Sequence, residues 1–434
     1  MTNNRIENGT RRNAAGTMSR IKTLDEKLKR IHADPHGCKD FILADAKDAD
    51  MALAIGATGR TTEKWPDGSP RFRTLAEYRK IIEEIVDQGL VDIMLMSAST
   101  SEELTIRKRI FDNSAVTPAC RGNDTTDIHV FRGGKSPGQP SLPFRTATID
   151  HIQCGKLHCS PAERHIGANL GLYSITYTND PIRDREALLA YNAFRLEAEE
   201  KGFRHFLEVF DPNVKGMVAP EHLGGFINDA IVRTLGGVTR SGRPDFLKIV
   251  YHGPRAMEEL VAYDPHLVVG ILGGSAGTTY DAFKLLAEAK KYGGRVALFG
   301  RKINQAENQL AFIHFLRLIA DGEIGPEEAV KAYHGVLQAL GVTPNRTLAD
   351  DMVLQTGVMS YGGTKTTSVP PAAAKPTATT SAPAVKAMIP NAPAKPAPAP
   401  VKAPVVDNNQ PDFSKMSQAE KVAWQRARWN RILG

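Results

Sequence analysis

The chain alternates short apolar, β-branched runs with amphipathic helical stretches from about Phe41 onward. This alternation is typical of parallel strands joined by helical crossovers. Strands are predicted at residues 41–47, 91–97, 116–121, 170–177, 205–211, 246–251, 267–272 and 295–299. Helices are predicted at residues 23–32, 75–88, 101–111, 184–201, 220–235, 255–263, 279–292 and 308–321. Eight strand–helix units favour an α/β fold of the (β/α)8 TIM-barrel class over an open doubly wound sheet, which usually has five or six strands.

Two segments of the predicted barrel have features of their own. In the helix at 184–201, Leu189, Ala193 and Leu196 recur at i, i+4 and i+7 and predict the apolar stripe that packs on the sheet. The connection at 122–168 after the third strand is far longer than an ordinary βα loop. It either forms a lid or wall of a site at the carboxyl ends of the strands, or it is a surface insertion or oligomer contact.

Composition divides the chain into four parts. Residues 1–22 are polar and predicted to be disordered, 23–360 form the barrel domain, and 361–412 are a Pro/Ala-rich linker unable to bury apolar surface. Residues 413–434 return to a helical pattern, with Ser417 and Glu420 as a capping box. Val422, Trp429 and Leu433 share one face of that predicted amphipathic helix.

Charge and cysteine content limit the class of protein. The net charge of +7 lies in the tail, because ten basic and three acidic residues follow from Lys365 while the body is neutral. A neutral body without a basic, aromatic-rich face argues against nucleic-acid binding. We find no apolar run of about 18 residues and no signal-peptide pattern, so we expect a cytoplasmic protein without a membrane anchor. The four scattered cysteines are expected to be free thiols.

The carboxyl ends of barrel strands are where barrel enzymes place their chemistry. Polar residues at these ends are Asp45 and Lys47 on the first strand, Arg121 on the third, Tyr177 on the fourth, Glu208 and Asp211 on the fifth, and Lys248 on the sixth.

Lys248 is the strongest candidate among them. It interrupts an apolar strand and alternates with Phe246 and Val250, so its side chain should point into the barrel. Burial there disfavours the protonated amine and leaves the lysine nucleophilic. The alternative is a structural lysine that pairs with a carboxylate in a barrel layer.

Glycines cluster after the last two predicted strands. Gly273, Gly274, Ser275 and Gly277 follow the seventh strand, and Gly300 and Arg301 follow the eighth. Exposed backbone N–H groups and an arginine at this place commonly bind a phosphate in barrels. The alternative is a pair of tight turns. A G-x-G-x-x-G dinucleotide motif is absent.

Metal-ligand residue types occur in the long connection, at His151, Cys154, His158 and Cys159. Their spacing matches no standard zinc pattern. We therefore predict neither a metal nor another cofactor.

Taken together, residues 41–316 resemble the class I aldolases of the deoxyribose-phosphate, tagatose-bisphosphate and sulfofructose-phosphate aldolase superfamily. The stretch around Lys248 is similar to the Schiff-base strand of that family, and the stretch around Glu208 to the strand with its proton-transfer glutamate. Asp45 resembles the aspartate that contacts substrate hydroxyls, and residues 275–277 with 300–301 resemble the phosphate site. The family has a second lysine on strand 4, but residues 170–174 contain none. The resemblance then requires Lys47 or Tyr177 to replace it, or a different proton-transfer step.

The resemblance implies a lyase that cleaves a phosphorylated ketose, reversibly, into a dihydroxyacetone-phosphate-like fragment and an aldehyde. The alternatives are a lysine-dependent isomerase or epimerase on the same fold, and a catalytically silent barrel that binds or scaffolds. We expect a homo-oligomer. A spacer that ends in a capped helix also resembles, in layout, the encapsulation peptides that deliver enzymes to bacterial microcompartment shells, so the tail is predicted to dock a shell or another protein.

Overall fold

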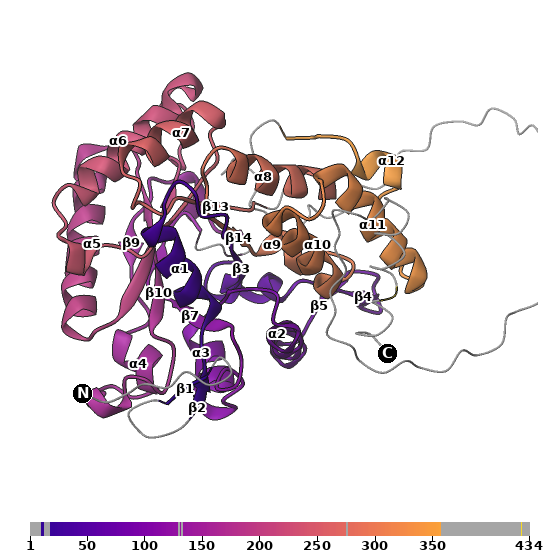
Figure 1. The fold of residues 1–434 in the computed structure, drawn as a ribbon, viewed down its shortest axis with the longest axis horizontal. Helices are drawn as coiled ribbons and strands as arrows, with labels where there is room; N and C mark the ends of the chain where they lie inside the picture. Colours follow the sequence, from indigo (N-terminus) through magenta and orange to yellow (C-terminus); the bar gives the residue numbers. More distant parts are fainter. Residues whose placement is uncertain are drawn as a thin grey trace, which may run out of the picture.

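The computed structural model describes residues 10–12, 18–128, 131, 133–274, 277–356 and 427. Its centre is a closed barrel of eight parallel strands surrounded by helices (Figure 1). In barrel order the strands are β3 (Ile42–Lys47), β6 (Ile93–Met96), β7 (Thr117–Arg121), β10 (Leu170–Thr176), β11 (Arg204–Phe210), β12 (Leu247–Ile249), β13 (Gly270–Leu272) and β14 (Val296–Phe299). The barrel prediction is confirmed, with one strand in each predicted region.

The outer layer consists of helices that follow the strands. The main ones are α2 (Leu75–Gln88), α3 (Ala98–Ser101), α5 (Pro181–Glu200), α6 (Leu223–Leu235), α7 (Pro254–Tyr263), α8 (Thr279–Lys291), α9 (Arg301–Asn304), α10 (Gln309–Asp321), α11 (Pro326–Ala339) and α12 (Leu348–Asp351). The helix predicted at 101–111 begins earlier, as α3, and a π-helical turn at Glu102–Arg107 continues it. α11 was not predicted. α5, α6 and α7 lie on one side of the molecule, and α10, α11 and α12 lie on the opposite side (Figure 1).

The two faces of each barrel strand are both buried. On β3, Ile42, Ala44 and Ala46 belong to the apolar cluster inside the barrel, whereas Leu43 belongs to the cluster between barrel and helices. The inner cluster also contains Leu24, Leu28 and Ile31 of α1 (Thr23–Ala33). α1 therefore closes the amino-terminal end of the barrel, and ligands must enter at the carboxyl end.

The predicted apolar stripe of α5 was on the wrong side of the helix. Leu189 and Leu196 are 53% and 61% exposed, and Ala193 is exposed as well. The face that packs on the barrel consists of Ala187, Tyr191, Phe194 and Ala198. Because α5 is apolar on two faces, spacing alone could not distinguish the core face from the solvent face.

The chain termini differ in what the structure describes. The segment predicted to be disordered contains an antiparallel pair of short strands, β1 (Thr10–Arg12) and β2 (Met18–Arg20). The predicted linker and C-terminal helix lie outside the described residues, except for Ala427. Within the described part of the chain, no helix is both long and apolar enough to cross a membrane.

The first half of the long connection covers the barrel mouth. It carries the short hairpin of β8 (Asp124–Thr125) and β9 (Pro143–Phe144). The Thr176 hydroxyl, at the end of β10, donates to Asp127 at 3.0 Å. Ile128 joins an apolar cluster with Phe210 and Leu272, the last residues of β11 and β13, and with Val250, which follows β12. This half therefore forms a wall of the mouth, which is the first of the two alternatives predicted for the connection.

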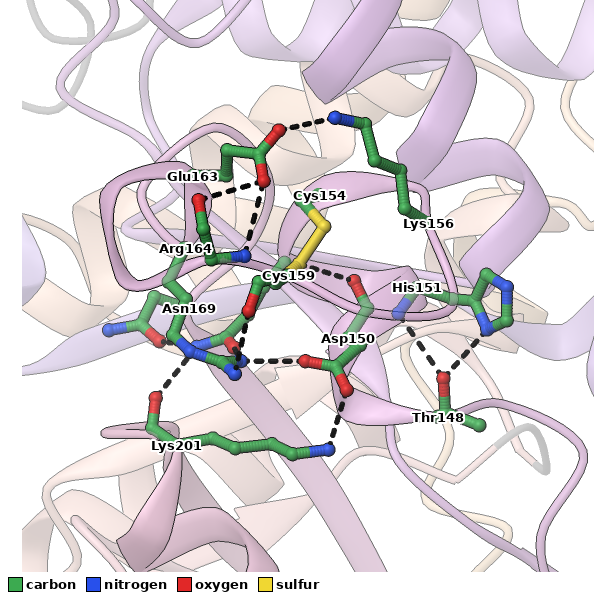
Figure 2. The surroundings of a disulfide bond; sticks show 12 residues. Thr148, Asp150, His151, Cys154, Lys156, Cys159, Glu163, Arg164, Asn169 and Lys201 are labelled. Atoms are coloured by element: carbon green, nitrogen blue, oxygen red, sulfur yellow. Dashed lines mark hydrogen bonds and ion pairs between the residues drawn. A yellow bond between two sulfur atoms is a disulfide. The ribbon is translucent and has the colours of Figure 1, made fainter.

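The second half of the connection packs on the outer side of the barrel, where Ile149 and Ile152 join the cluster between barrel and helices. Figure 2 shows the surroundings of its disulfide. The Asp150 carboxylate on α4 (Ile149–Cys154) forms ion pairs at 2.8 Å with Arg164 and with Lys201, which follows α5. Thr148 caps α4 by accepting from the backbone N–H of His151. This half is thus a surface insertion anchored to α5.

The prediction of four free thiols was wrong for one pair. Cys154 and Cys159 form a disulfide with their Cα atoms 6.1 Å apart, while Cys38 and Cys120 are free. The reason is local: α4 ends at Cys154, and Gly155, in the left-handed region, turns the chain back. The two Cα atoms then lie within the range a disulfide can span.

Candidate active site

Lys248 and Glu208 form an ion pair at the carboxyl end of the barrel. The two residues face each other in register on the neighbouring strands β12 and β11. Lys248 Nζ lies 2.5 Å from Glu208 Oε1, with side chains 8% and 1% exposed. The preceding inward residues, Phe206 and Phe246, stack below them in the inner cluster, with ring centroids 4.5 Å apart. The prediction that Lys248 points into the barrel is confirmed.

Arg121 and Ser174 extend this ion pair into a network. Ser174 Oγ donates to Glu208 Oε2 at 2.6 Å and accepts from the Arg121 guanidinium at 3.2 Å. The guanidinium also lies 3.8 Å from Glu208 Oε2. Burial alone would lower the pKa of Arg121, but the carboxylates of Asp48 and Glu208 raise it above its ordinary value. Arg121 therefore stays charged and fixes the Glu208 carboxylate opposite Lys248.

Asp48 is the carboxylate that the sequence analysis missed. It follows β3 directly, is buried, and accepts from Arg121 Nε at 2.7 Å. It lines the same small cavity as Lys248, Glu208 and Arg121. Counting inward positions along Ile42, Ala44 and Ala46 would have reached Asp48, but the resemblance pointed to Asp45 instead.

Asp45 and Lys47 do not reach this cavity, so their predicted place at the site was wrong. They alternate with the inward residues of β3 and face the helix layer, where both are fully buried. Lys47 Nζ lies 2.9 Å from Asp45 and donates to Gln309 of α10, also at 2.9 Å. Burial raises the pKa of Asp45 and lowers that of Lys47. This pair joins β3 to α10.

Tyr177 was also predicted at the site and points elsewhere. It belongs to the cluster between barrel and helices, and its phenol bonds to the hydroxyl of Thr234 on α6. Burial raises its pKa to about 12. Neither Lys47 nor Tyr177 therefore replaces the strand 4 lysine of the resembling family. On that strand, the inward residue within reach of Glu208 is Ser174.

The glycine-rich loops do meet at the cavity. Gly273, Gly274, Gly300 and Arg301 line it together with Lys248. Gly277 lies outside this lining and Ser275 outside the described residues.

Packing also requires two of these glycines. A Cβ at Gly273 would lie 2.1 Å from the ring of Phe299, and one at Gly300 would lie 2.7 Å from the carbonyl oxygen of Ala46. Close packing therefore explains these two glycines without a phosphate. The motif is compatible with a phosphate site and with a pair of tight turns.

Lys302, on α9, joins the two loops and was not predicted. Its amine donates to the carbonyl oxygen of Gly277 at 2.8 Å and is almost fully buried. Burial lowers its pKa to about 8. Lys302 thus holds the loop after β13 against the helix that carries Arg301.

The cavity beside Lys248 is small, about 60 Å³. Above it lies the apolar cluster of Ile128, Phe210, Val250 and Leu272, with Ala52 packed against it. We define these five residues as the apolar cover. Ala52 and Leu272 of this cover also line the cavity.

The described residues contain no group of three His, Cys, Asp or Glu side chains arranged to hold a metal ion. The chemistry within reach is that of an amine and a carboxylate. Glu208 lies within hydrogen-bonding distance of the amine, which is the geometry that proton transfer between the two groups requires.

Neither a family model nor a curated protein matches the chain. Solved structures do match. An archaeal fructose 1,6-bisphosphate aldolase is 16% identical over 69% of this chain and all of that one, with a TM-score of 0.48. A Schiff-base-forming fructose-1,6-bisphosphate aldolase is 17% identical with the same coverage and TM-score. The carboxyl transferase domain of Rhizobium etli pyruvate carboxylase is 10% identical over 73% of this chain and 51% of that one, with a TM-score of 0.40.

Proposed function

We propose that the chain is a class I aldolase that cleaves a phosphorylated ketose, reversibly, through a Schiff base on Lys248. The observation that carries the proposal is the contact between Lys248 and Glu208 in a buried cavity whose rim holds Arg301 and the glycine-rich loops. An amine that loses its proton to a neighbouring carboxylate attacks a carbonyl, and the resulting iminium serves as the electron sink for carbon–carbon cleavage. This chemistry requires no metal.

The steps assign a task to each group. Glu208 takes the proton of the Lys248 ammonium, and Lys248 Nζ bonds to the ketose carbonyl carbon to give a carbinolamine. Glu208 returns the proton to the carbinolamine hydroxyl, which leaves as water and gives the iminium. Glu208 then takes the proton of the hydroxyl on the carbon that becomes the aldehyde, as the carbon–carbon bond breaks. The aldehyde leaves, and the electron pair of the broken bond moves into the iminium to give an enamine. Protonation of the enamine and hydrolysis release the dihydroxyacetone-phosphate-like fragment.

The remaining site residues position these groups. Arg121 and Ser174 hold Glu208, and Asp48 holds Arg121. We assign to Ser174 and Glu208 together the proton transfer that a strand 4 lysine performs in the resembling family. Gly273, Gly274 and Gly300 would present backbone N–H groups to the phosphate, and Arg301 its guanidinium.

One observation favours a second candidate. Because Lys248 is already paired with a carboxylate, it can act as a proton donor in an isomerase or epimerase without forming a covalent bond. Borohydride trapping in the presence of dihydroxyacetone phosphate, read by mass spectrometry, separates the candidates. The aldolase gains a covalent adduct on Lys248. An isomerase or a catalytically silent barrel gains none.

We also propose, on sequence grounds, that the enzyme is cytoplasmic and that residues 413–434 dock it onto a microcompartment shell or another protein. Deletion of residues 365–434 should leave the specific activity of the barrel unchanged and abolish co-sedimentation with that partner. A truncated chain that loses its fold or activity would instead place the helix within the barrel domain.

A further inference from the structure

A second cavity, of about 920 Å³, opens between the amino-terminal ends of α6 and α7. It lies at the carboxyl ends of β11 and β12, the same end of the barrel as Lys248, but its lining shares no residue with the cavity around Lys248. The mechanism proposed above does not use it.

A buried pair of titratable groups lines this cavity. Asp211 Oδ1 lies 2.9 Å from His252 Nε2, with side chains 16% and 9% exposed. In the described part of the chain, three atoms of this pair have no partner in hydrogen-bonding geometry: Nδ1 and Nε2 of His252 and Oδ1 of Asp211. A buried polar group left without a hydrogen bond is unfavourable. The pair is therefore poised to bond to hydroxyl groups of a ligand.

The charges at the rim restrict the ligand. Glu221, Asp229 and Glu259 bring three carboxylates to the lining, against the single guanidinium of Arg255. Like charges at a binding surface repel a partner strongly. A phosphate or carboxylate is therefore disfavoured, and a neutral chain rich in hydroxyl groups fits the acceptors and donors at the base.

The position of this pair relates it to Lys248. His252 follows Lys248 by four residues, and Asp211 follows Glu208 by three. Both residues follow the carboxyl ends of their strands, at Phe210 and Ile249, and so lie farther toward the mouth than Lys248 and Glu208. The apolar cover borders both cavities, because Leu272 lines the small one and Val250 lines the large one. The subsite proposed below requires this cover to move and so join the two cavities.

We propose that this second cavity is the subsite for the aldehyde half of the substrate, and that His252 and Asp211 select an unphosphorylated, hydroxyl-rich chain. The inference rests on the proposed aldolase function. It names the substrate class as ketoses whose only phosphate lies on the fragment that bonds to Lys248.

The test compares two aldehydes in the condensation direction with dihydroxyacetone phosphate as the partner. D-erythrose is long enough to reach the second cavity, whereas glycolaldehyde is not. His252→Asn and Asp211→Asn should each raise the KM for erythrose at least tenfold and leave the KM for glycolaldehyde unchanged. The wild-type enzyme should also prefer erythrose to erythrose 4-phosphate. His266→Gln, an exposed histidine outside the cavity, serves as the control.

Borohydride trapping with dihydroxyacetone phosphate alone distinguishes the two ways to fail. Both variants should form the Lys248 adduct at the wild-type rate, which also shows that they fold. An unchanged KM for erythrose, or an equal rise for both aldehydes, overturns the subsite while the aldolase stands. A wild-type protein that forms no adduct overturns the proposed function itself.

A second, independent inference concerns the exposed face of α5. Ile182, Leu189 and Leu196 are 68%, 53% and 61% exposed and recur every seven residues. They lie opposite the face that packs on the barrel, and α5 forms an outer edge of the molecule (Figure 1). A seven-residue apolar repeat keeps one line of side chains against a partner helix.

Charge identifies the partner of this helix. Arg185 is exposed in the first half of α5, and Glu199 and Glu200 are exposed in its last turn. An antiparallel pair of α5 helices places the arginine of each copy near the glutamates of the other. We infer that a second copy of the chain covers this stripe, in a twofold, isologous dimer.

Light scattering on the full chain tests the dimer. The wild type should have the mass of a dimer or an even-numbered oligomer, and Leu189→Glu with Leu196→Glu should halve it. Leu157→Glu, at a leucine 62% exposed in the disulfide loop, is the matched control and should not change it. A monomeric wild type would overturn the inference, and so would an unchanged mass of the double variant. A chain that dimerises only when residues 413–434 are deleted would also overturn it.

Discussion

Lys248 Nζ and Glu208 Oε1 lie 2.5 Å apart, at one register position of two adjacent parallel strands. Lysine and arginine both satisfy this contact, but only lysine forms an imine. Lys248→Arg is therefore the sharpest variant, with Lys248→Ala beside it. Under the aldolase mechanism the kcat of both variants should fall at least about a thousandfold, because without the Lys248 amine no Schiff base can form.

The measurement combines steady-state rates with thermal unfolding, which checks that the variants remain folded. Lys248→Arg should unfold near the wild-type temperature because Glu208 keeps a cationic neighbour. If this variant retained more than about a tenth of the wild-type rate, the covalent mechanism would be excluded and the ion-pair isomerase favoured.

Glu208→Gln should separate imine formation from cleavage. Ser174 Oγ lies 2.6 Å from the Glu208 carboxylate, so the neutral amide can keep the hydrogen bond while losing the ability to move a proton. We expect cleavage to slow by about 10²–10⁴, the usual contribution of general acid–base catalysis. The borohydride adduct on Lys248 should still form. An unchanged cleavage rate removes Glu208 from the proton transfer.

The sequence predicted which segments form the barrel better than which way their side chains point. Lys248 was placed inward correctly because it alternates with Phe246 and Val250. Asp45, Lys47 and Tyr177 were predicted at the site but face the helix layer. Strands of a parallel barrel are buried on both faces, so they lack the polar–apolar alternation that identifies the inner side of an antiparallel strand. On β3 every position is buried.

Two other features, one of the fold and one near the site, depend on tertiary contacts that no local sequence pattern encodes. The helix at Pro326–Ala339 packs on α10, in which all residues from Ala311 to Ala320 are buried. No strand precedes Pro326–Ala339 to mark a repeat unit. The Asp211–His252 pair joins the ends of two strands 41 residues apart in sequence. Asp211 was noticed as a strand-end residue, but its partner was visible only once the barrel brought β11 and β12 together.

Asp45 and Lys47 provide a test of stability rather than activity. Lys47→Met leaves the Asp45 carboxylate buried beside α10 without its cation, and breaking a buried ion pair in this way costs about 3–5 kcal/mol. The free energy of unfolding should fall accordingly in urea titrations. The double variant Asp45→Leu with Lys47→Met should recover much of the loss, because two apolar groups replace both charges.

The activity of these variants distinguishes the two readings of the pair. Since neither side chain lines the cavity of Lys248, kcat/KM per folded molecule should stay within about twofold of the wild type. A Lys47→Met protein of normal stability and strongly reduced kcat/KM would contradict the outward placement and restore Lys47 to the chemistry.

Asp211 should make the stability of the protein depend on pH. Burial raises its pKa from the ordinary 3.8 to about 7. A carboxyl group with a raised pKa binds its proton more tightly in the folded state, so its favourable contribution is present below pH 4 and is lost as the pH rises to 7. Above pH 7 the folded protein must hold an ionised, buried carboxylate. The shift of about three units corresponds to at most about 4 kcal/mol.

Asp211→Asn removes that proton and keeps a group of the same shape beside His252. The difference in unfolding free energy, variant minus wild type, should therefore increase by about 2–4 kcal/mol between pH 4 and pH 8, with most of the rise between pH 5 and 7. Urea titrations across this range measure it. Asp112→Asn, at an exposed surface aspartate, should give a flat difference and controls for the general effect of removing a carboxylate. A flat difference for Asp211→Asn too would mean that the carboxyl titrates normally, because water or the imidazolium of His252 stabilises its charge.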